Sequence, residues 1–175
     1  MGTMPPATGN PAGRKAVFLD RDGVINRLLE GDYVKDWSEF SFLPGAVRAI
    51  RMIRELGFLV VVVTNQQGIG RGLMTEADLH GIHRRLLLEM EREGAAVDAI
   101  YYCPHTAESA CLCRKPETGM FLQAAGELNL GLDLSYMVGD SASDVEAARR
   151  AGCRPVFIGV PEERPGDDCL VFPGR

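Results

Sequence analysis

The sequence lacks the features that mark secreted, membrane-embedded and nucleic-acid-binding proteins. Its first 13 residues contain no apolar run, so we expect neither a signal peptide nor a membrane span there. It has no excess of basic residues: 19 Lys and Arg stand against 24 Asp and Glu, giving a net charge of -5. This balance argues against a protein that mainly binds polyphosphate backbones, and it leaves small anionic substrates open.

The chain also lacks the pairs of cysteines, spread along the sequence, that form the disulfide framework of a secreted protein. Three of the five cysteines lie together with a histidine between positions 103 and 113. We therefore expect a cytoplasmic protein.

The chain has 175 residues, which is too short for two domains of ordinary size, and it contains no internal repeat. Residues 1–13 are rich in Pro, Gly, Ala and Thr and are expected to form a disordered tail. Residues 14–160 are expected to form one domain. The polar, turn-rich start of residues 161–175 predicts a C-terminal appendage.

Short apolar runs alternate with stretches that carry helix start and stop signals. Strands are expected at 16–19, 58–63, 97–102, 136–139 and 154–158, and helices at 45–56, 75–93, 117–128 and 141–151. This alternation predicts an α/β fold, a doubly wound three-layer sandwich with a mainly parallel sheet. The segment 24–42 does not fit the alternation and is expected to form a flap after the first strand.

Polar residues follow three of the predicted strands directly. Because ligands bind beyond the carboxyl ends of the strands in an open parallel sheet, we expect Asp20, Thr64 and Asp140 to meet there. An aspartate at a strand tip can attack phosphorus when a divalent cation neutralises the charges around it. Asp22, two residues further on, can return to move the proton, and Gly23 permits the sharp turn that this requires.

Other residues are expected to assist the transfer. Thr64 offers a hydroxyl to the transferring group, and Lys115 can offset the charge on its equatorial oxygens. Asp140 supplies a hard oxygen ligand for Mg²⁺, whereas Asp144 is expected to orient Lys115 or a metal-bound water.

A purely structural interpretation of the same residues stays open at this point. In that interpretation Asp20 and Asp22 cap a turn, and Thr64 begins a loop. Asp140 is then the N-cap of the helix that starts at Ser141.

A second cluster favours a metal of a different kind. Cys103, His105, Cys111 and Cys113 supply one imidazole and three thiolates in a short loop, enough for a closed tetrahedral Zn²⁺ site. Four protein ligands leave no open position, which favours a structural role. Free thiols or a redox pair are the alternative.

Four motifs occur in a fixed order along the chain. They are Asp20-Arg21-Asp22-Gly23-Val24, Val63-Thr64-Asn65, Arg114-Lys115-Pro116 and Gly139-Asp140-x-x-x-Asp144. With them the sequence resembles the haloacid dehalogenase (HAD) superfamily of phosphatases over about residues 14–160. Residues 64–72, 101–105 and 111–116 resemble in particular the D-glycero-D-manno-heptose 1,7-bisphosphate phosphatases.

This resemblance implies a largely capless HAD-like phosphatase domain with a zinc-binding loop. It implies that Asp20 is the nucleophile and Asp22 the acid/base, and that Mg²⁺ binds Asp20, the Asp22 carbonyl and Asp140. The implied reaction removes the C7 phosphate of a heptose bisphosphate through an aspartyl-phosphate, on the route to nucleotide-activated heptose. We expect a monomer whose partner is a small phosphorylated sugar, with neither nucleic acid nor membrane involved.

The family's substrate contacts carry over onto twelve residues, which are Asp20, Arg21, Asp22, Gly31, Asp32, Tyr33, Thr64, Asn65, Gln66, Gln67, Arg114 and Lys115. The chain departs from the family pattern in two places. The stretch 26–33 is longer than the usual spacing, and Ser141 stands where some members carry Lys.

Three other functions fit parts of the pattern. A histidinol-phosphate phosphatase shares the scaffold and the zinc loop. A polynucleotide 3'-phosphatase shares Thr64-Asn65-Gln66, but the zinc loop and the missing basic stripe argue against it. A catalytically silent HAD-fold binding domain is disfavoured because Asp20 and Asp22 are both present.

Two histidines lie three residues apart on the helix expected at 75–93, which places them on one helix face. No carboxylate or thiol completes a ligand set near them in the sequence. His80 and His83 are therefore expected to be ordinary helix residues.

Overall fold

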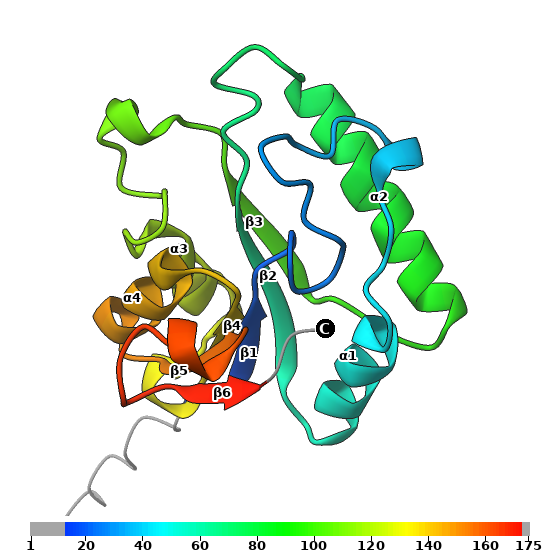
Figure 1. Ribbon diagram of the computed structural model, residues 1–175. Helices are drawn as coiled ribbons and strands as arrows, with labels where there is room; N and C mark the ends of the chain where they lie inside the picture. The colour runs from blue at the N-terminus through cyan, green and yellow to red at the C-terminus, as the bar shows by residue number, and fades with distance from the viewer. Residues whose placement is uncertain (1–12, 173–175) are drawn as a thin grey trace, which may run out of the picture.

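Six parallel strands form a single sheet in the computed structural model, which describes residues 13–172 (Figure 1). Their order across the sheet is β3-β2-β1-β4-β5-β6. The strands are β1 (Ala16–Leu19), β2 (Leu59–Asn65), β3 (Ala99–Cys103), β4 (Tyr136–Gly139), β5 (Arg154–Ile158) and β6 (Leu170–Phe172). The predicted α/β fold is confirmed, and every strand pair in the described part of the chain is parallel.

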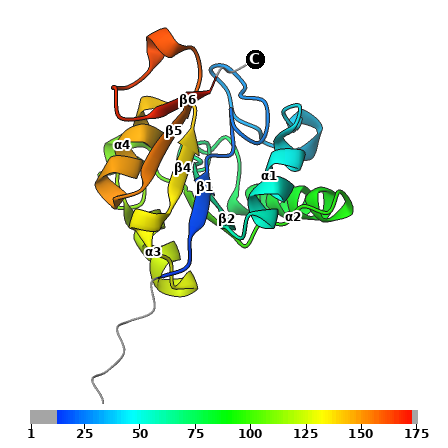
Figure 2. The same ribbon diagram turned by 90° about the horizontal axis from the view of Figure 1, so that it is seen from below.

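Helices cover both faces of this sheet. One face carries α1 (Ala46–Glu55) and α2 (Glu76–Arg92), and the other carries α3 (Gly119–Leu128) and α4 (Ala142–Ala151), as Figures 1 and 2 show from two directions. The predicted three layers are therefore present. None of the helices within residues 13–172 is long and apolar enough to span a membrane.

The continuous apolar run of β2 explains how both faces are filled. Val60 and Val62 belong to the core cluster under α1 and α2, whereas Val61 and Val63 belong to the cluster under α3. All four are 0% exposed. Because successive side chains of a strand point to opposite faces, an unbroken run of valines buries both of them.

Local capping sets where the helices begin. Thr75 and Asp78 form a capping box at the start of α2, as the Thr-x-x-Asp pattern predicts. Ser141 and Asp144 form a second box at the start of α4. The cap of α4 is thus Ser141, and the interpretation of Asp140 as an N-cap is wrong.

Two elements start two residues later than predicted, for reasons visible in the hydrogen bonds. β3 begins at Ala99, two residues later than expected, because the Asp98 carboxylate accepts the backbone N–H of Val60 at 2.8 Å. α3 begins at Gly119, two residues later than expected, because the Glu117 N–H donates to the Arg114 carbonyl at 2.7 Å in a preceding turn.

The C-terminal segment contributes more than its polar composition indicates. Residues 161–175 include β6, which pairs with β5 and extends the sheet by one strand that the sequence did not predict. Cys169, just before β6, is 5% exposed and packs with Val145 and Phe157. The tail expected at residues 1–13 lies almost wholly outside the described residues.

The order of the strands places a switch point between β1 and β4. From β1 the chain adds β2 and then β3 in one direction, whereas β4, β5 and β6 extend the sheet in the other. The predicted flap follows β1, and within it Trp37 and Phe40 stack at 4.6 Å between centroids. Phe40 belongs to the core cluster under α1 and α2, and Trp37 packs against that cluster, which holds the flap on the domain. No second domain covers the switch point within residues 13–172.

Candidate active site

Three carboxylates converge at the switch point. Asp20 follows β1, Asp140 follows β4, and Asp144 lies in the first turn of α4. One oxygen of each lies within 4.8 Å of the others. They share an open pocket of 410 Å³ with residues from the flap, β2 and the loop before α3. Its lining consists of Asp20, Asp22, Leu28, Leu29, Asp32, Tyr33, Val34, Asn65, Gln67, Arg114, Lys115, Asp140, Ser141, Ser143 and Asp144.

Lys115 places a buried cation beside these carboxylates. Its Nζ lies 2.9 Å from Asp20 Oδ1 and 2.6 Å from Asp144 Oδ1, and it donates to the Val63 carbonyl at 2.8 Å. Burial favours a neutral amine, but the negative charges of Asp20 and Asp144 raise the pKa of Lys115 above its ordinary value. The amine is therefore charged and fixed in place.

Asn65 holds the backbone that carries this lysine. Its side-chain amide donates to the Lys115 carbonyl at 3.1 Å, and its oxygen accepts the Lys115 N–H at 3.0 Å. The end of β2 is thus bonded to the loop before α3 through one side chain. Asn65 is one of the predicted substrate contacts, and it lines the pocket.

A buried cradle orients Asp22. Arg21, which is fully buried, donates from Nη2 to both carboxylate oxygens at 2.9 Å. Asn26 donates to Oδ1 and Gln66 to Oδ2, each at 2.8 Å. Burial alone raises the pKa of Asp22, yet the Arg21 charge and these hydrogen bonds bring it below its ordinary value.

Gly23 completes the turn that brings Asp22 back over the strand ends. Its φ is +88°, in the left-handed region, and a Cβ there would lie 1.8 Å from Asp140 Oδ2. Both the turn and the close approach to Asp140 exclude a side chain at this position. The predicted role of Gly23 in the turn is confirmed.

The negative charges of Asp20, Asp140 and Asp144 repel one another. Burial, followed by the charges of Asp20 and Asp144, raises the pKa of Asp140 to about 7. Burial also raises the pKa of Asp20 to about 6, although Lys115 opposes the rise. Such a cluster of oxygen donors, charged beyond what one lysine balances, fits a hard divalent cation.

Comparison with known proteins identifies relatives of this chain. A family model described as HAD-hydrolase-like matches residues 112–168. A D-glycero-alpha-D-manno-heptose-1,7-bisphosphate 7-phosphatase of Mycobacterium tuberculosis is 46% identical over 149 residues, which cover 82% of this chain and 78% of the relative. A D-glycero-beta-D-manno-heptose-1,7-bisphosphate 7-phosphatase of Pseudomonas aeruginosa is 44% identical over 147 residues, covering 83% and 81%.

A solved structure agrees with the sequence relatives. The D,D-heptose 1,7-bisphosphate phosphatase of B. bronchiseptica, complexed with magnesium and phosphate, is 35% identical and superposes with a TM-score of 0.81 over 91% of this chain and 92% of the other. The chain belongs to the D-glycero-D-manno-heptose 1,7-bisphosphate 7-phosphatase family. The predicted membership of the HAD superfamily and the enzyme class, a phosphoric monoester hydrolase, are thereby confirmed.

Not all the substrate contacts expected of this heptose phosphatase family are side-chain contacts in the structure. Arg21 and Gln66 are 0% exposed, and their side chains point to Asp22, so neither side chain is available to a ligand. Thr64 is 1% exposed, and its hydroxyl accepts a hydrogen bond from Gln66 at 2.8 Å behind the pocket. Gly31 forms a turn with φ of +73° and does not line the pocket.

Other expected substrate contacts do line the pocket. Asp32 and Tyr33 reach the pocket from the flap, Gln67 from the loop after β2, and Arg114 from the loop before α3. Tyr33 packs on the loop after β2, since a Cβ on Gly68 would lie 3.1 Å from its ring. The flap and this loop thus form one rim of the pocket.

The cysteine loop lies next to this rim. Sγ of Cys113 is 3.0 Å from Sγ of Cys103 and 3.5 Å from Sγ of Cys111, and His105 Nδ1 is 3.3 Å from Cys113. These S···S separations exceed the roughly 2.05 Å of a disulfide. The four donor atoms lie within 4.8 Å of one another, a grouping that fits a tetrahedral Zn²⁺. Arg114 Nη1 donates to the His105 carbonyl at 3.3 Å, which links the cluster to the pocket.

Sequence reasoning missed two residues that support Asp22. Asn26 donates to its carboxylate, and His83 of α2 lies 3.3 Å from Nη1 of Arg21. His83 is 7% exposed, so it is a buried residue of the helix that contacts Arg21. Its position on the apolar face of α2 was the available signal, since Leu79, Ile82 and Leu86 are buried on that face.

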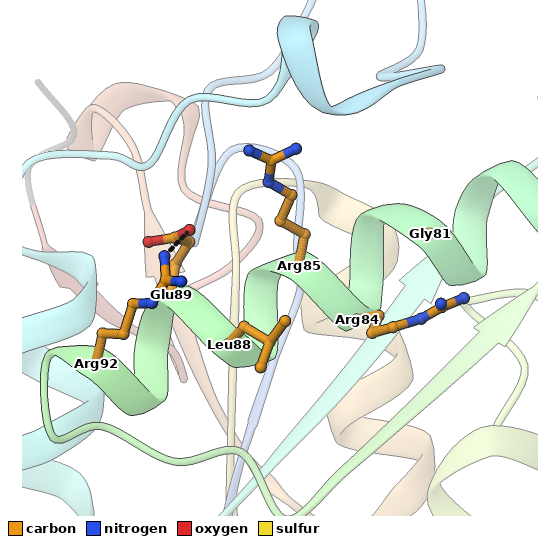
Figure 3. A pocket seen from close by; sticks show the side chains of 6 residues that line it. All are labelled: Gly81, Arg84, Arg85, Leu88, Glu89 and Arg92. Atoms are coloured by element: carbon orange, nitrogen blue, oxygen red, sulfur yellow. Dashed lines mark hydrogen bonds and ion pairs between the residues drawn. The ribbon is translucent and has the colours of Figure 1, made fainter.

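A second hollow lies along the outer side of α2, away from the carboxylates (Figure 3). It is lined by Gly81, Arg84, Arg85, Leu88, Glu89 and Arg92. Arg92 pairs with Glu89 at 2.8 Å, and Arg85 lies over the ring of Trp37 at 5.4 Å. Two of its three arginines, Arg85 and Arg92, thus have partners on the protein surface, and no candidate nucleophile lines it.

Proposed function

We propose that this protein hydrolyses the C7 phosphate of D-glycero-D-manno-heptose 1,7-bisphosphate through an aspartyl-phosphate on Asp20. The observation that carries the proposal is the position of Asp20, at the tip of β1, facing the pocket and paired with the buried Lys115 at 2.9 Å. The names of the sequence relatives and of the neighbouring structure support the choice of substrate.

The reaction has two steps at phosphorus. An Asp20 oxygen forms a bond to phosphorus while the bond from phosphorus to the C7 oxygen breaks, and that oxygen takes a proton from Asp22. A water molecule then attacks the phosphoryl group and gives a proton to Asp22. Inorganic phosphate and the original Asp20 carboxylate are released.

The cradle around Asp22 bears on the first step. Because the pKa of Asp22 is lowered, its carboxylate is ionised in the free protein. The dianionic phosphate of an incoming substrate adds negative charge beside it, which raises the pKa again. The substrate therefore promotes the protonated form that acts as the acid.

Mg²⁺ is the metal we propose for the carboxylate cluster. Asp20, Asp140 and the backbone carbonyl of Asp22 would hold it. Burial and the neighbouring charges of Asp20 and Asp144, which together raise the pKa of Asp140 to about 7, support this assignment. When bound, the ion neutralises charge on the carboxylates and the phosphoryl oxygens. Lys115 balances part of the same charge from the protein side.

We assign Zn²⁺ to Cys103, His105, Cys111 and Cys113, with a structural role. The ion would hold the loop that carries Arg114 and Lys115 into the pocket. Asp32, Tyr33, Gln67 and Arg114 line the rim and are the proposed side-chain contacts of the sugar. We further propose that the protein acts in the cytoplasm as a monomer, without nucleic-acid or membrane partners.

The test is a steady-state comparison of kcat/KM for the α and β anomers of heptose 1,7-bisphosphate, histidinol phosphate and a 3'-phosphorylated oligonucleotide, with Mg²⁺ present. We expect one or both heptose bisphosphates to be preferred, and the ratio between them gives the anomer. Asp20→Asn should abolish turnover and leave the circular dichroism spectrum unchanged. Preference for histidinol phosphate, or near wild-type rates in Asp20→Asn, contradicts the proposal.

A further inference from the structure

His83 stands behind the acid/base residue without reaching the pocket. Its ring is packed edge-on against Tyr102 of β3, with centroids 6.1 Å apart, and its Nε2 lies 3.3 Å from Nη1 of Arg21. It is 7% exposed and does not line the pocket. Any effect on the reaction must therefore pass through Arg21.

Arg21 needs such a neighbour because its side chain is fully buried. Nε and Nη2 donate to Asp22, and Nη2 also donates to Gln66 at 3.2 Å. That leaves Nη1, which faces His83. A buried donor without an acceptor costs about 1–3 kcal/mol, so the imidazole satisfies a group that water cannot reach.

The imidazole is suited to accept because it is neutral. Burial and then the adjacent Arg21 charge lower the pKa of His83 to about 3. The lone pair of Nε2 thus faces the guanidinium, and Nδ1 carries the proton. A protonated ring would instead place two cations in contact.

We infer that His83 is a positioning residue for the proton transfer, because its Nε2 accepts from Arg21 and thereby fixes the guanidinium that orients the Asp22 carboxylate. This inference rests on the acid/base role proposed for Asp22. Asp22 receives its other hydrogen bonds from Asn26 and Gln66, so losing His83 loosens the cradle without removing it.

Three variants separate this role from simple packing. His83→Leu keeps an apolar side chain in the cavity and removes the acceptor, whereas His83→Gln offers an amide oxygen to Arg21. His80→Ala is the matched control, because His80 lies one turn earlier on α2 and bonds to the hydroxyl of Tyr102 at 3.0 Å without touching Arg21.

The assay compares kcat/KM for two aryl esters, phenyl phosphate and p-nitrophenyl phosphate. Phenolate needs a proton as it leaves, and p-nitrophenolate leaves without one, so only the first ester depends on a well-placed acid. For His83→Leu we expect a loss on the order of tenfold with phenyl phosphate and less than about twofold with p-nitrophenyl phosphate. His83→Gln and His80→Ala should stay near wild type with both.

Equal losses with both esters in His83→Leu would show a merely structural role and overturn the inference, as would no loss with either. Failure of His83→Gln to restore the phenyl phosphate rate also overturns it, because the acceptor is then not what matters. Neither ester is a heptose. A wild-type protein that does not hydrolyse heptose bisphosphates therefore rejects the proposed substrate and leaves this comparison intact.

Discussion

Asp144 connects the start of α4 to Lys115, the buried lysine of the pocket, and replacing Asp144 with asparagine tests that connection. Its Oδ2 accepts from the Ser141 hydroxyl at 2.6 Å and from the Ser141 N–H at 3.2 Å, while its Oδ1 lies 2.6 Å from Lys115 Nζ. Asn has one acceptor oxygen and one NH₂ group. In Asp144→Asn the NH₂ must therefore face either the lysine or the helix cap, and one of the two contacts is lost.

The expected cost is large because the side chains of Asp144 and Lys115 are both 1% exposed. Breaking a buried ion pair by neutralising one partner costs about 3 kcal/mol or more. For a chain of this size that corresponds to a fall in Tm of about 6–12 °C. Ser141→Ala is the control, since it removes only the cap hydroxyl and should cost about 1 kcal/mol.

Urea unfolding gives the free energy of unfolding of the wild type and of each variant. The effect on function is measured as kcat with the preferred phosphate ester. We expect Asp144→Asn to lower kcat on the order of a hundredfold, because Lys115 loses one of the carboxylates that hold it beside Asp20. A loss of stability in Asp144→Asn no greater than in Ser141→Ala would refute the reasoning, because the pair with Lys115 would then contribute nothing beyond the cap.

Four further outcomes are expected. Asp22→Asn should reduce turnover severely and allow aspartyl-phosphate to be trapped by rapid acid quenching; an unchanged rate would remove its proton-transfer role. Gly23→Ala should weaken Mg²⁺ binding measured by calorimetry, because the added methyl group occupies the position of Asp140 Oδ2; wild-type affinity would mean that the turn can shift. Cys113→Ser should lower bound zinc, measured by elemental analysis, together with activity, and full activity in zinc-free protein would contradict the structural role. The pKa of Asp140, raised from 3.8 to about 7, makes the metal-free protein lose stability as pH rises through that interval, so Mg²⁺ should increase Tm more at about pH 8 than at about pH 5.5. Equal increases in Tm at the two pH values would show that Asp140 is not the titrating ligand.

The strands and the identity of the chemical groups could be predicted because they depend on short-range patterns. β1, β4 and β5 have the bounds that their apolar runs predict, and the polar residues that follow β1 and β4 meet at the switch point. Parallel topology alone is enough to bring such residues together, whatever the intervening loops do.

The support of Asp22 could not be predicted in the same way. His83 is separated from Arg21 by 62 positions, and its role depends on the rotation of α2 about its own axis against the sheet. β6 escaped prediction because only three residues pair, at an edge where one side of the strand has no neighbour within the described chain. Both features depend on tertiary packing, which local composition does not encode.

The open switch point has a consequence for how this protein can change over evolutionary time. Chemistry is confined to the tips of strands and to a lysine locked by buried partners, whereas the pocket rim is drawn from the flap and two loops. Surface loops tolerate insertion and substitution far better than the buried elements that carry them. Selection can therefore alter which phosphate ester is accepted, for instance through the flap, while the residues that break the ester are inherited unchanged.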